Sequence, residues 1–80
     1  MIETSITPNE ILARESDELV GKIVFERNES KLVILHTYAY QSGRGIGSIL
    51  MEAAIAYAEQ EQLTIRPVCS FAAKYLEKKA

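Results

Sequence analysis

Three glycines at alternate positions, Gly43, Gly45 and Gly47, stand in the middle of this chain of 80 residues. The segment before them, residues 31–40, contains the uninterrupted apolar run Leu-Val-Ile-Leu, which is typical of a strand covered on both faces. The segment after them has apolar residues at helical spacing. Because glycine tolerates positive φ and a close approach by other groups, the three glycines predict a tight strand-to-helix turn. This combination indicates an α/β fold.

Short turn signals divide the rest of the chain into segments of strand or helix length. Pro8-Asn9, Ser16-Asp17-Glu18 and Asn28-Glu29-Ser30 carry residues that favour tight turns. Ser70 is the expected N-cap of a last helix. The expected elements are, in order, strands at residues 11–14, 19–27 and 31–40, a helix at 48–62, a strand at 63–68 and a helix at 70–79.

Alternation assigns the side chains of the second expected strand to two faces. Leu19, Ile23 and Phe25 share one face, and Lys22 and Glu26 take the other, which is the pattern of a half-buried strand. The first expected helix carries an apolar stripe that should face the sheet. The stripe is formed by Ile46, Leu50, Ala53, Ala54, Tyr57 and Ala58.

The order of strands and helices predicts a mixed sheet. The first three strands should form an antiparallel meander. The helix at 48–62 returns the chain as a right-handed crossover, so the fourth strand runs parallel to the third. Pro67 favours an edge or a strand end for the fourth strand. With a C-terminal helix also available to cover the sheet, residues 1–80 are expected to form a single α/β domain.

Charge and composition exclude several classes of protein. The net charge is −2, so no basic face for nucleic acid is indicated. No uncharged apolar run has membrane-spanning length, and the N-terminus does not resemble a secretory signal. The single cysteine, Cys69, excludes an internal disulfide, and no residues have metal-ligand spacing. We expect a cytoplasmic protein without a metal or a membrane partner.

Two further expectations concern the ends of the fold. Lys74, Lys78 and Lys79 are interpreted as a solvated helix end that complements the helix dipole. A small domain has a thin core, and an open sheet edge can pair with another chain. A homodimer is therefore a reasonable expectation.

The glycine turn has the properties of an anion-binding loop. The first N–H groups of a helix lack partners within the helix, and the helix dipole favours negative charge there. A Walker A loop would need Lys followed by Ser or Thr after its last glycine, whereas Ser48-Ile49 follows here. The dinucleotide fingerprint needs a third glycine three residues after the second, and here the spacing is two. A phosphate-bearing cofactor is predicted; the alternative is a turn without a ligand.

On these residues the sequence resembles the GNAT superfamily of N-acetyltransferases. The cofactor loop of that family follows Gln/Arg-x-x-Gly-x-Gly/Ala, which residues 42–47 match except that Ser42 stands in place of Gln or Arg. The resemblance is closest to very small GNAT-like proteins, in which a His-Thr pair precedes the loop and a Pro-x-Cys-x-Phe segment follows the next strand. His36-Thr37 and residues 67–71 supply these two segments.

The resemblance implies a GNAT-like acyl-CoA N-acyltransferase fold. It also implies that the chain binds acetyl-CoA and transfers its acetyl group to an amine, which the sequence does not identify. The pantetheine arm would run along the main chain of Tyr38, Ala39 and Tyr40, as an added strand would. The residues expected around the pyrophosphate are Gly43, Arg44, Gly45, Ile46, Gly47 and Ser48.

Two points of this resemblance leave alternatives open. Arg44 would meet a phosphate of CoA, or it would be a solvent-exposed loop arginine. The chain is also too short for the extra elements that build the acceptor pocket in longer family members. The alternatives to an enzyme are therefore a non-catalytic module that binds CoA or acyl-CoA, and a small interaction protein without a ligand.

Two side chains near the C-terminus are the first candidates for catalysis. Cys69 could accept the acetyl group as a thiolate, because a helix N-terminus lowers the pKa of a thiol. Its alternative is a small buried apolar residue. Tyr75 occupies a position where the superfamily often has a tyrosine near the CoA sulfur, and its hydroxyl could protonate the departing thiolate. Its alternative is a tyrosine that packs the helix on the sheet.

The third candidate is the single histidine, His36. Strict alternation places it on the same face as Ile34, Tyr38 and Tyr40. An imidazole at this position could act as a general base toward the amine. The alternative is a histidine that only packs on the strand.

Overall fold

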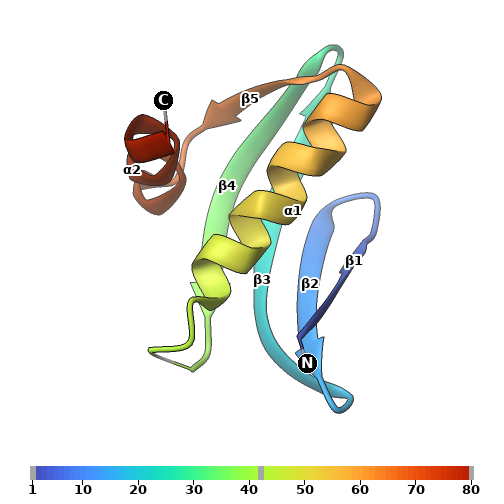
Figure 1. Cartoon of the computed structure of the whole chain (residues 1–80). Helices are drawn as coiled ribbons and strands as arrows, with labels where there is room; N and C mark the ends of the chain where they lie inside the picture. The colour runs from blue at the N-terminus through green and yellow to red at the C-terminus, as the bar shows by residue number, and fades with distance from the viewer. Residues whose placement is uncertain (1, 42, 80) are drawn as a thin grey trace.

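The computed structural model describes residues 2–41 and 43–79, which form a sheet with two helices (Figure 1). Ser42 of the predicted loop lies outside the described residues. The elements are, in order, β1 (Glu3–Ile6), β2 (Glu10–Glu15), β3 (Glu18–Asn28), β4 (Lys31–Ala39), α1 (Ile46–Glu61), β5 (Thr64–Pro67) and α2 (Ser70–Lys79).

The strands of the described residues form one sheet in the order β1-β2-β3-β4-β5. The pairs from β1 to β4 are antiparallel, and β5 runs parallel to β4. The predicted meander, the crossover helix and the parallel fourth strand are thus confirmed. Because β5 pairs with β4, the apolar run of β4 lies inside the sheet, as predicted.

Strand β1 is an element that the sequence patterns did not predict. All four of its residues are exposed, so it has no alternation of buried and exposed side chains. It pairs with β2 through a turn in which the backbone N–H of Thr7 donates to the Glu10 carbonyl at 2.8 Å. The Glu10 N–H donates in return to the Thr7 Oγ1 at 3.0 Å. Pairing with β2 and the hydrogen bonds of this turn therefore determine the position of β1, since none of its side chains is buried.

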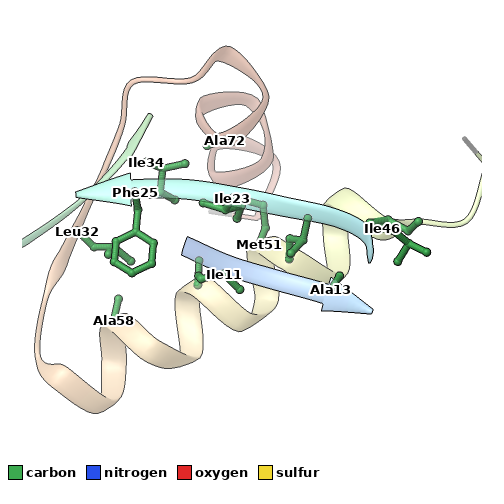
Figure 2. Close-up of a cluster of buried hydrophobic side chains, with 13 residues drawn as sticks. Ile11, Ala13, Ile23, Phe25, Leu32, Ile34, Ile46, Met51, Ala58 and Ala72 are labelled. Carbon is green, nitrogen blue, oxygen red and sulfur yellow. The ribbon is translucent and has the colours of Figure 1, made fainter. Parts of the chain in front are cut away.

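Helix α1 lies across one face of the sheet and closes the core (Figure 1). Most of the predicted stripe faces the sheet, while Ala53 and Tyr57 are half-buried at its margin. Figure 2 shows Phe25, Ile11 and Met51 between the strands and this helix. The helix residues that are buried are Ile46, Leu50, Met51, Ala54 and Ala58.

Helix α2 lies beside β4, beyond the end of β5 (Figure 1). It begins at Ser70, where a last helix was predicted, and α1 begins at Ile46, two residues before its predicted start. Ala72 of α2 is fully buried. Neither helix, within the part of the chain that the structure describes, is long and apolar enough to cross a membrane.

Two β-bulges change which side chains face α1. On β3, Val20 has no counterpart on β2, because Ala13 pairs with Gly21 and Arg14 pairs with Leu19. The extra residue reverses the faces at this point. Val20 is consequently buried, and the prediction that Leu19 shares the face of Ile23 and Phe25 is wrong.

The second bulge lies on β4. Ile34 pairs with Phe25 and His36 pairs with Val24, so Leu35 is the extra residue. Residues directly opposite each other in an antiparallel pair share a face. Thr37 therefore shares the face of its buried partner Ile23, which is the face that α1 covers.

Gly21 of β3 allows a close approach between the sheet and the start of α1. A Cβ on Gly21 would lie 2.6 Å from Ile46 Cγ2 and 2.8 Å from the Tyr38 carbonyl oxygen. The second of these atoms is backbone, which a rotamer change cannot move away. The position therefore accepts only glycine while α1 keeps its distance from β3.

We predict that Gly21→Ala destabilises the protein by about 1–3 kcal/mol, because it overpacks this contact. Thermal unfolding followed by circular dichroism measures the effect. Ser30→Ala, at an exposed turn, is the matched control and should leave the midpoint almost unchanged. A midpoint for Gly21→Ala that equals the wild-type midpoint would show that β3 and α1 are not in close contact.

Candidate functional site

The loop between β4 and α1 presents open backbone at the helix N-terminus. Gly43 and Gly45 have φ angles of 75° and 68°, in the left-handed region that favours glycine. Gly45 is the N-cap of α1 and provides no side-chain hydrogen bond to the first turn. The first helical bond runs from the Ile49 N–H to the Gly45 carbonyl at 3.0 Å. The amides of Ile46, Gly47 and Ser48 precede that bond, so this end of α1 is suited to an anion.

A groove of about 210 Å³ lies over these amides. Because no atom lies within 4 Å of a Cβ built on Gly43 or Gly45, the loop surface is open to a ligand. The groove therefore combines residues predicted around the pyrophosphate with Gln41 and Phe71, which were not predicted. Its lining residues are Ala39, Gln41, Gly43, Gly45, Ile46, Gly47, Ser48 and Phe71.

A second, wider groove lies next to the first. It has a volume of about 500 Å³ and is lined by Ser48, Phe71, Lys74, Tyr75 and Lys78. Ser48 and Phe71 line both grooves, so the two are adjacent. The wider groove offers two ammonium groups and two stacked aromatic rings, whose centroids are 6.3 Å apart.

Gly47 allows Phe71 to lie against the start of α1. A Cβ on Gly47 would be 2.5 Å from the Cζ atom of Phe71. The third glycine of the sequence pattern therefore serves helix-to-helix contact, whereas Gly43 and Gly45 serve the backbone conformation of the loop. This contact places Phe71 between the two grooves.

Cys69 is the N-cap of α2, a position that was predicted for Ser70. Its carbonyl accepts the first helical bond, from the Ala73 N–H at 3.0 Å, so Ser70 is already inside the helix. The half-buried thiol donates to the Thr37 hydroxyl at 3.6 Å. Thr37 lies on β4, just beyond the bulge at Leu35.

The surroundings of Cys69 favour its thiolate. Burial by itself would raise the pKa of the thiol, but hydrogen bonds from the Ala72 N–H, the Thr37 hydroxyl and the Phe71 N–H to the ionised sulfur outweigh it. The pKa of Cys69 is therefore lowered from its ordinary value. The lowered pKa that was predicted from a nearby helix N-terminus has a specific cause, because the sulfur itself accepts hydrogen bonds from the first turn.

Strand β4 has an unpaired edge beside this thiol. Pairing between β4 and β5 covers Lys31 to Ile34 and ends at Pro67. The Val68 and Cys69 N–H groups then both donate to the Ile34 carbonyl, at 3.0 and 3.1 Å. Beyond Ile34 no strand of the described residues pairs with this edge, which leaves backbone groups available to a ligand.

His36 lies on the other face of β4, where its predicted neighbours are only partly correct. It keeps Tyr38 and Tyr40 on its own face. The ring centroids of His36 and Tyr38 are 6.0 Å apart, and those of Tyr38 and Tyr40 are 6.4 Å apart. Ile34 is fully buried on the face of α1, so the prediction that it shares a face with His36 is wrong. The bulge at Leu35 is the physical reason. The proposed base role of His36 stays a prediction.

The three residues predicted along the pantetheine arm divide between two surfaces. Ala39 lines the groove over the loop. Tyr38 and Tyr40 are 40% and 53% exposed, with their rings on the face opposite α1. Their rings lie away from the groove, and the predicted contact of their backbone with the pantetheine arm stays a prediction.

Tyr75 lies in the wider groove, where its hydroxyl donates to the Glu52 carboxylate. Cys69 contacts Thr37 and lines neither groove, so the structure does not bring these two predicted catalytic residues together. The role of Tyr75 as a proton donor stays a prediction. In the sequence, Phe71 and Thr37 stand out only as members of the two short motifs. The position of Phe71 depends on Gly47, and that of Thr37 depends on the bulge at Leu35.

The Arg44 guanidinium is held by two other side chains of the protein. It contacts the Glu15 carboxylate at 2.6 and 2.8 Å, and Nη1 also donates to the Gln41 Oε1 at 2.7 Å. The predicted contact of Arg44 with a phosphate stays a prediction.

No group of three His, Cys, Asp or Glu side chains in the described residues is arranged to hold a metal ion.

Comparison with known proteins identifies the family of this chain. The model of the GCN5-related N-acetyl-transferase family matches residues 10–80. The chain therefore belongs to this family. A search of curated proteins finds no matching sequence.

Solved structures with the same fold include three acetyltransferases. A ribosomal-protein-alanine N-acetyltransferase from Brucella melitensis biovar Abortus is 23% identical with a TM-score of 0.66, over 89% of this chain and 60% of that one. A protein described as a streptothricin acetyltransferase from Bacillus anthracis, in complex with acetyl coenzyme A, is 23% identical with a TM-score of 0.66, over 90% and 47%. A GNAT-family acetyltransferase from Streptococcus pneumoniae is 20% identical with a TM-score of 0.60, over 88% and 57%. The chain thus spans 60% or less of each of these proteins.

We predict that Thr37→Val raises the pKa of Cys69, because it removes a hydroxyl that stabilises the thiolate. Cys69 is the single cysteine of the chain, so the rate of alkylation by iodoacetamide against pH reports this thiol alone. The midpoint of the rate profile should move to higher pH in the variant. Thr64→Val, on β5 and away from the thiol, is the control. A profile that does not move in Thr37→Val would contradict the contact.

Proposed function

We propose that this chain binds acetyl-CoA and transfers its acetyl group to an amine. The observation that carries the proposal is the continuity of three features. The unpaired edge of β4 leads from Thr37, which contacts the Cys69 thiol, to the loop that precedes the open amides of α1. Membership of the N-acetyltransferase family and the acetyl coenzyme A bound to a protein of the same fold support it.

The loop groove is the proposed site of the pyrophosphate. Backbone N–H groups of Ile46, Gly47 and Ser48 would donate to its oxygens, with the dipole of α1 behind them. The pantetheine arm would leave this groove past Ala39 and run along the free edge of β4 toward Thr37. Its amide groups would pair with the strand edge as an added strand does. This path ends beside Cys69.

The wider groove is the proposed site of the adenosine portion of CoA. It is adjacent to the loop groove, and Lys74 and Lys78 give it two positive charges for the 3′-phosphate. The Phe71 and Tyr75 rings offer apolar faces for the base. This placement assigns Tyr75 to the adenosine end of CoA, in place of the predicted role as proton donor at its sulfur. In this interpretation the two lysines bind a ligand, in addition to complementing the dipole at the end of α2.

We predict that the double variant Lys74→Ala/Lys78→Ala binds CoA about tenfold more weakly, because two charge-assisted contacts to the 3′-phosphate are lost. Titration calorimetry with CoA and with dephospho-CoA, which lacks this phosphate, measures the effect. The variant and the wild type should bind dephospho-CoA equally. Lys31→Ala, at the far end of β4, is the matched control.

Two results of this titration would contradict the proposal. No heat from the wild type at millimolar CoA would contradict cofactor binding altogether. An equal loss of affinity for CoA and dephospho-CoA in the double variant would show that the lysines do not meet the 3′-phosphate.

Cys69 is the proposed acceptor of the acetyl group in the first half of the reaction. Its thiolate attacks the thioester carbonyl, the bond from the carbonyl carbon to the CoA sulfur breaks, and the CoA thiolate takes up the proton that Cys69 released. A neutral amine then attacks the acetyl-cysteine. The carbon–sulfur bond breaks, the amine proton returns to Cys69, and an amide is released.

His36, next to Thr37 but on the opposite face of β4, is the candidate base that keeps the amine neutral.

We predict that incubation with acetyl-CoA, without an amine, adds one acetyl group to the wild-type protein. Intact-mass spectrometry detects the adduct, and hydroxylamine should remove it because it is a thioester. Cys69→Ala should remain unmodified. An adduct that persists in Cys69→Ala, or one that resists hydroxylamine, would exclude Cys69 as the acetyl carrier.

A further inference from the structure

The β2–β3 hairpin places two carboxylates opposite each other near the glycine loop. Its turn residues, Ser16 and Asp17, both have positive φ, 51° and 67°, as two-residue hairpin turns of type I′ require. The turn fixes Glu15 directly opposite Glu18. Like charges in such a pair destabilise a hairpin unless a cation lies between or beside them.

Side chains of the loop meet both of these carboxylates. Arg44 binds Glu15 through two parallel bonds, from Nη1 at 2.6 Å and from Nη2 at 2.8 Å. Gln41 accepts from the same Nη1 at 2.7 Å and donates through Nε2 to the Glu18 Oε1 at 3.3 Å. The chain of contacts therefore runs from Glu18 through Gln41 and Arg44 to Glu15. Figure 1 shows the hairpin and the loop at the same end of the sheet.

Stability of the fold is a poor explanation for this network. Its members are at the surface, where ion pairs add little to the free energy of unfolding. The bidentate geometry is nevertheless specific, and the hydrogen bond from Arg44 holds the pKa of Glu15 at about 2. The Glu15 carboxylate is therefore ionised throughout the neutral range, and Arg44 has a constant partner.

Among the described residues of the loop, Gly43 and Gly45 supply no side-chain contact that would fix the backbone. A Cβ added at Gly43 or Gly45 would meet no atom within 4 Å, and the N-cap of α1 makes no side-chain bond. Freezing a glycine-rich loop on a ligand costs conformational entropy, which reduces affinity. A link from outside the loop would lower that cost by fixing the loop before the ligand arrives.

We propose that the β2–β3 hairpin braces the cofactor loop, with Arg44 as a positioning residue held by Glu15 and not as a phosphate ligand. The inference rests on the proposed binding of CoA at this loop. The brace holds the open amides of α1 in place for the pyrophosphate.

The direction in which Glu15→Gln changes the affinity for CoA distinguishes the brace from direct binding of phosphate by Arg44. If Arg44 positions the loop, Glu15→Gln weakens CoA binding by about threefold to tenfold, and Arg44→Gln does the same. The double variant should then lose no more CoA affinity than the single variant that binds CoA more weakly, because the two substitutions remove the same interaction. If Arg44 instead binds phosphate, Glu15→Gln releases it from a competitor and CoA binds more tightly. Unchanged or tighter binding of CoA by Glu15→Gln would overturn the brace. So would a double variant whose loss of affinity equals the sum of the two single losses.

Glu61→Gln is the matched control, since it weakens the Arg27–Glu61 ion pair of 2.9 Å at the other end of α1. Its CoA affinity should equal that of the wild type. Amide hydrogen exchange of the free proteins provides a readout that needs no ligand. The Gly43, Arg44 and Gly45 amides should exchange faster in Glu15→Gln than in the wild type and in Glu61→Gln. Equal rates would overturn the brace even where CoA binds, whereas faster rates without CoA binding would contradict only the proposed function.

Discussion

An extra residue in β4, Leu35, separates the half of the strand that pairs with β5 from the half that does not. Before it, Ile34 is buried against α1; after it, Thr37 takes that face and His36 takes the other. Past Ile34 the chain that follows β5 no longer pairs with β4 and enters α2, which brings Cys69 to Thr37. The face from which Thr37 meets Cys69, and the face that carries His36 and the exposed tyrosines, both depend on this one interruption.

Backbone and side chains have different tasks in the proposed site. The groups that would meet the pyrophosphate are amides at a helix N-terminus, and glycine gives a ligand access to them. Side chains act from outside this cradle: Phe71 packs on Gly47, and Arg44 ties the loop to the hairpin. Substitution of the residue at position 44 would therefore alter affinity without changing the donors themselves.

Local patterns in the sequence predicted the meander, the crossover helix and the order of elements, because these depend on alternation and turn residues. They did not predict β1, whose exposed side chains carry no pattern, or the bulges at Val20 and Leu35. A bulge shifts faces by one residue, so the positions assigned to Leu19 and His36 were partly wrong. The contacts of Cys69 with Thr37 and of Arg44 with Glu15 join distant segments, and no local signal specifies such pairs.

The central claim is that the cofactor lies on the α1 amides and along the free edge of β4. Backbone amide shifts in a ¹⁵N-labelled sample titrated with CoA test it most directly. We expect the largest changes at Ile46, Gly47 and Ser48, and a second series from Leu35 to Ala39. Saturating changes confined to other parts of the sheet, or none at these amides, would contradict it.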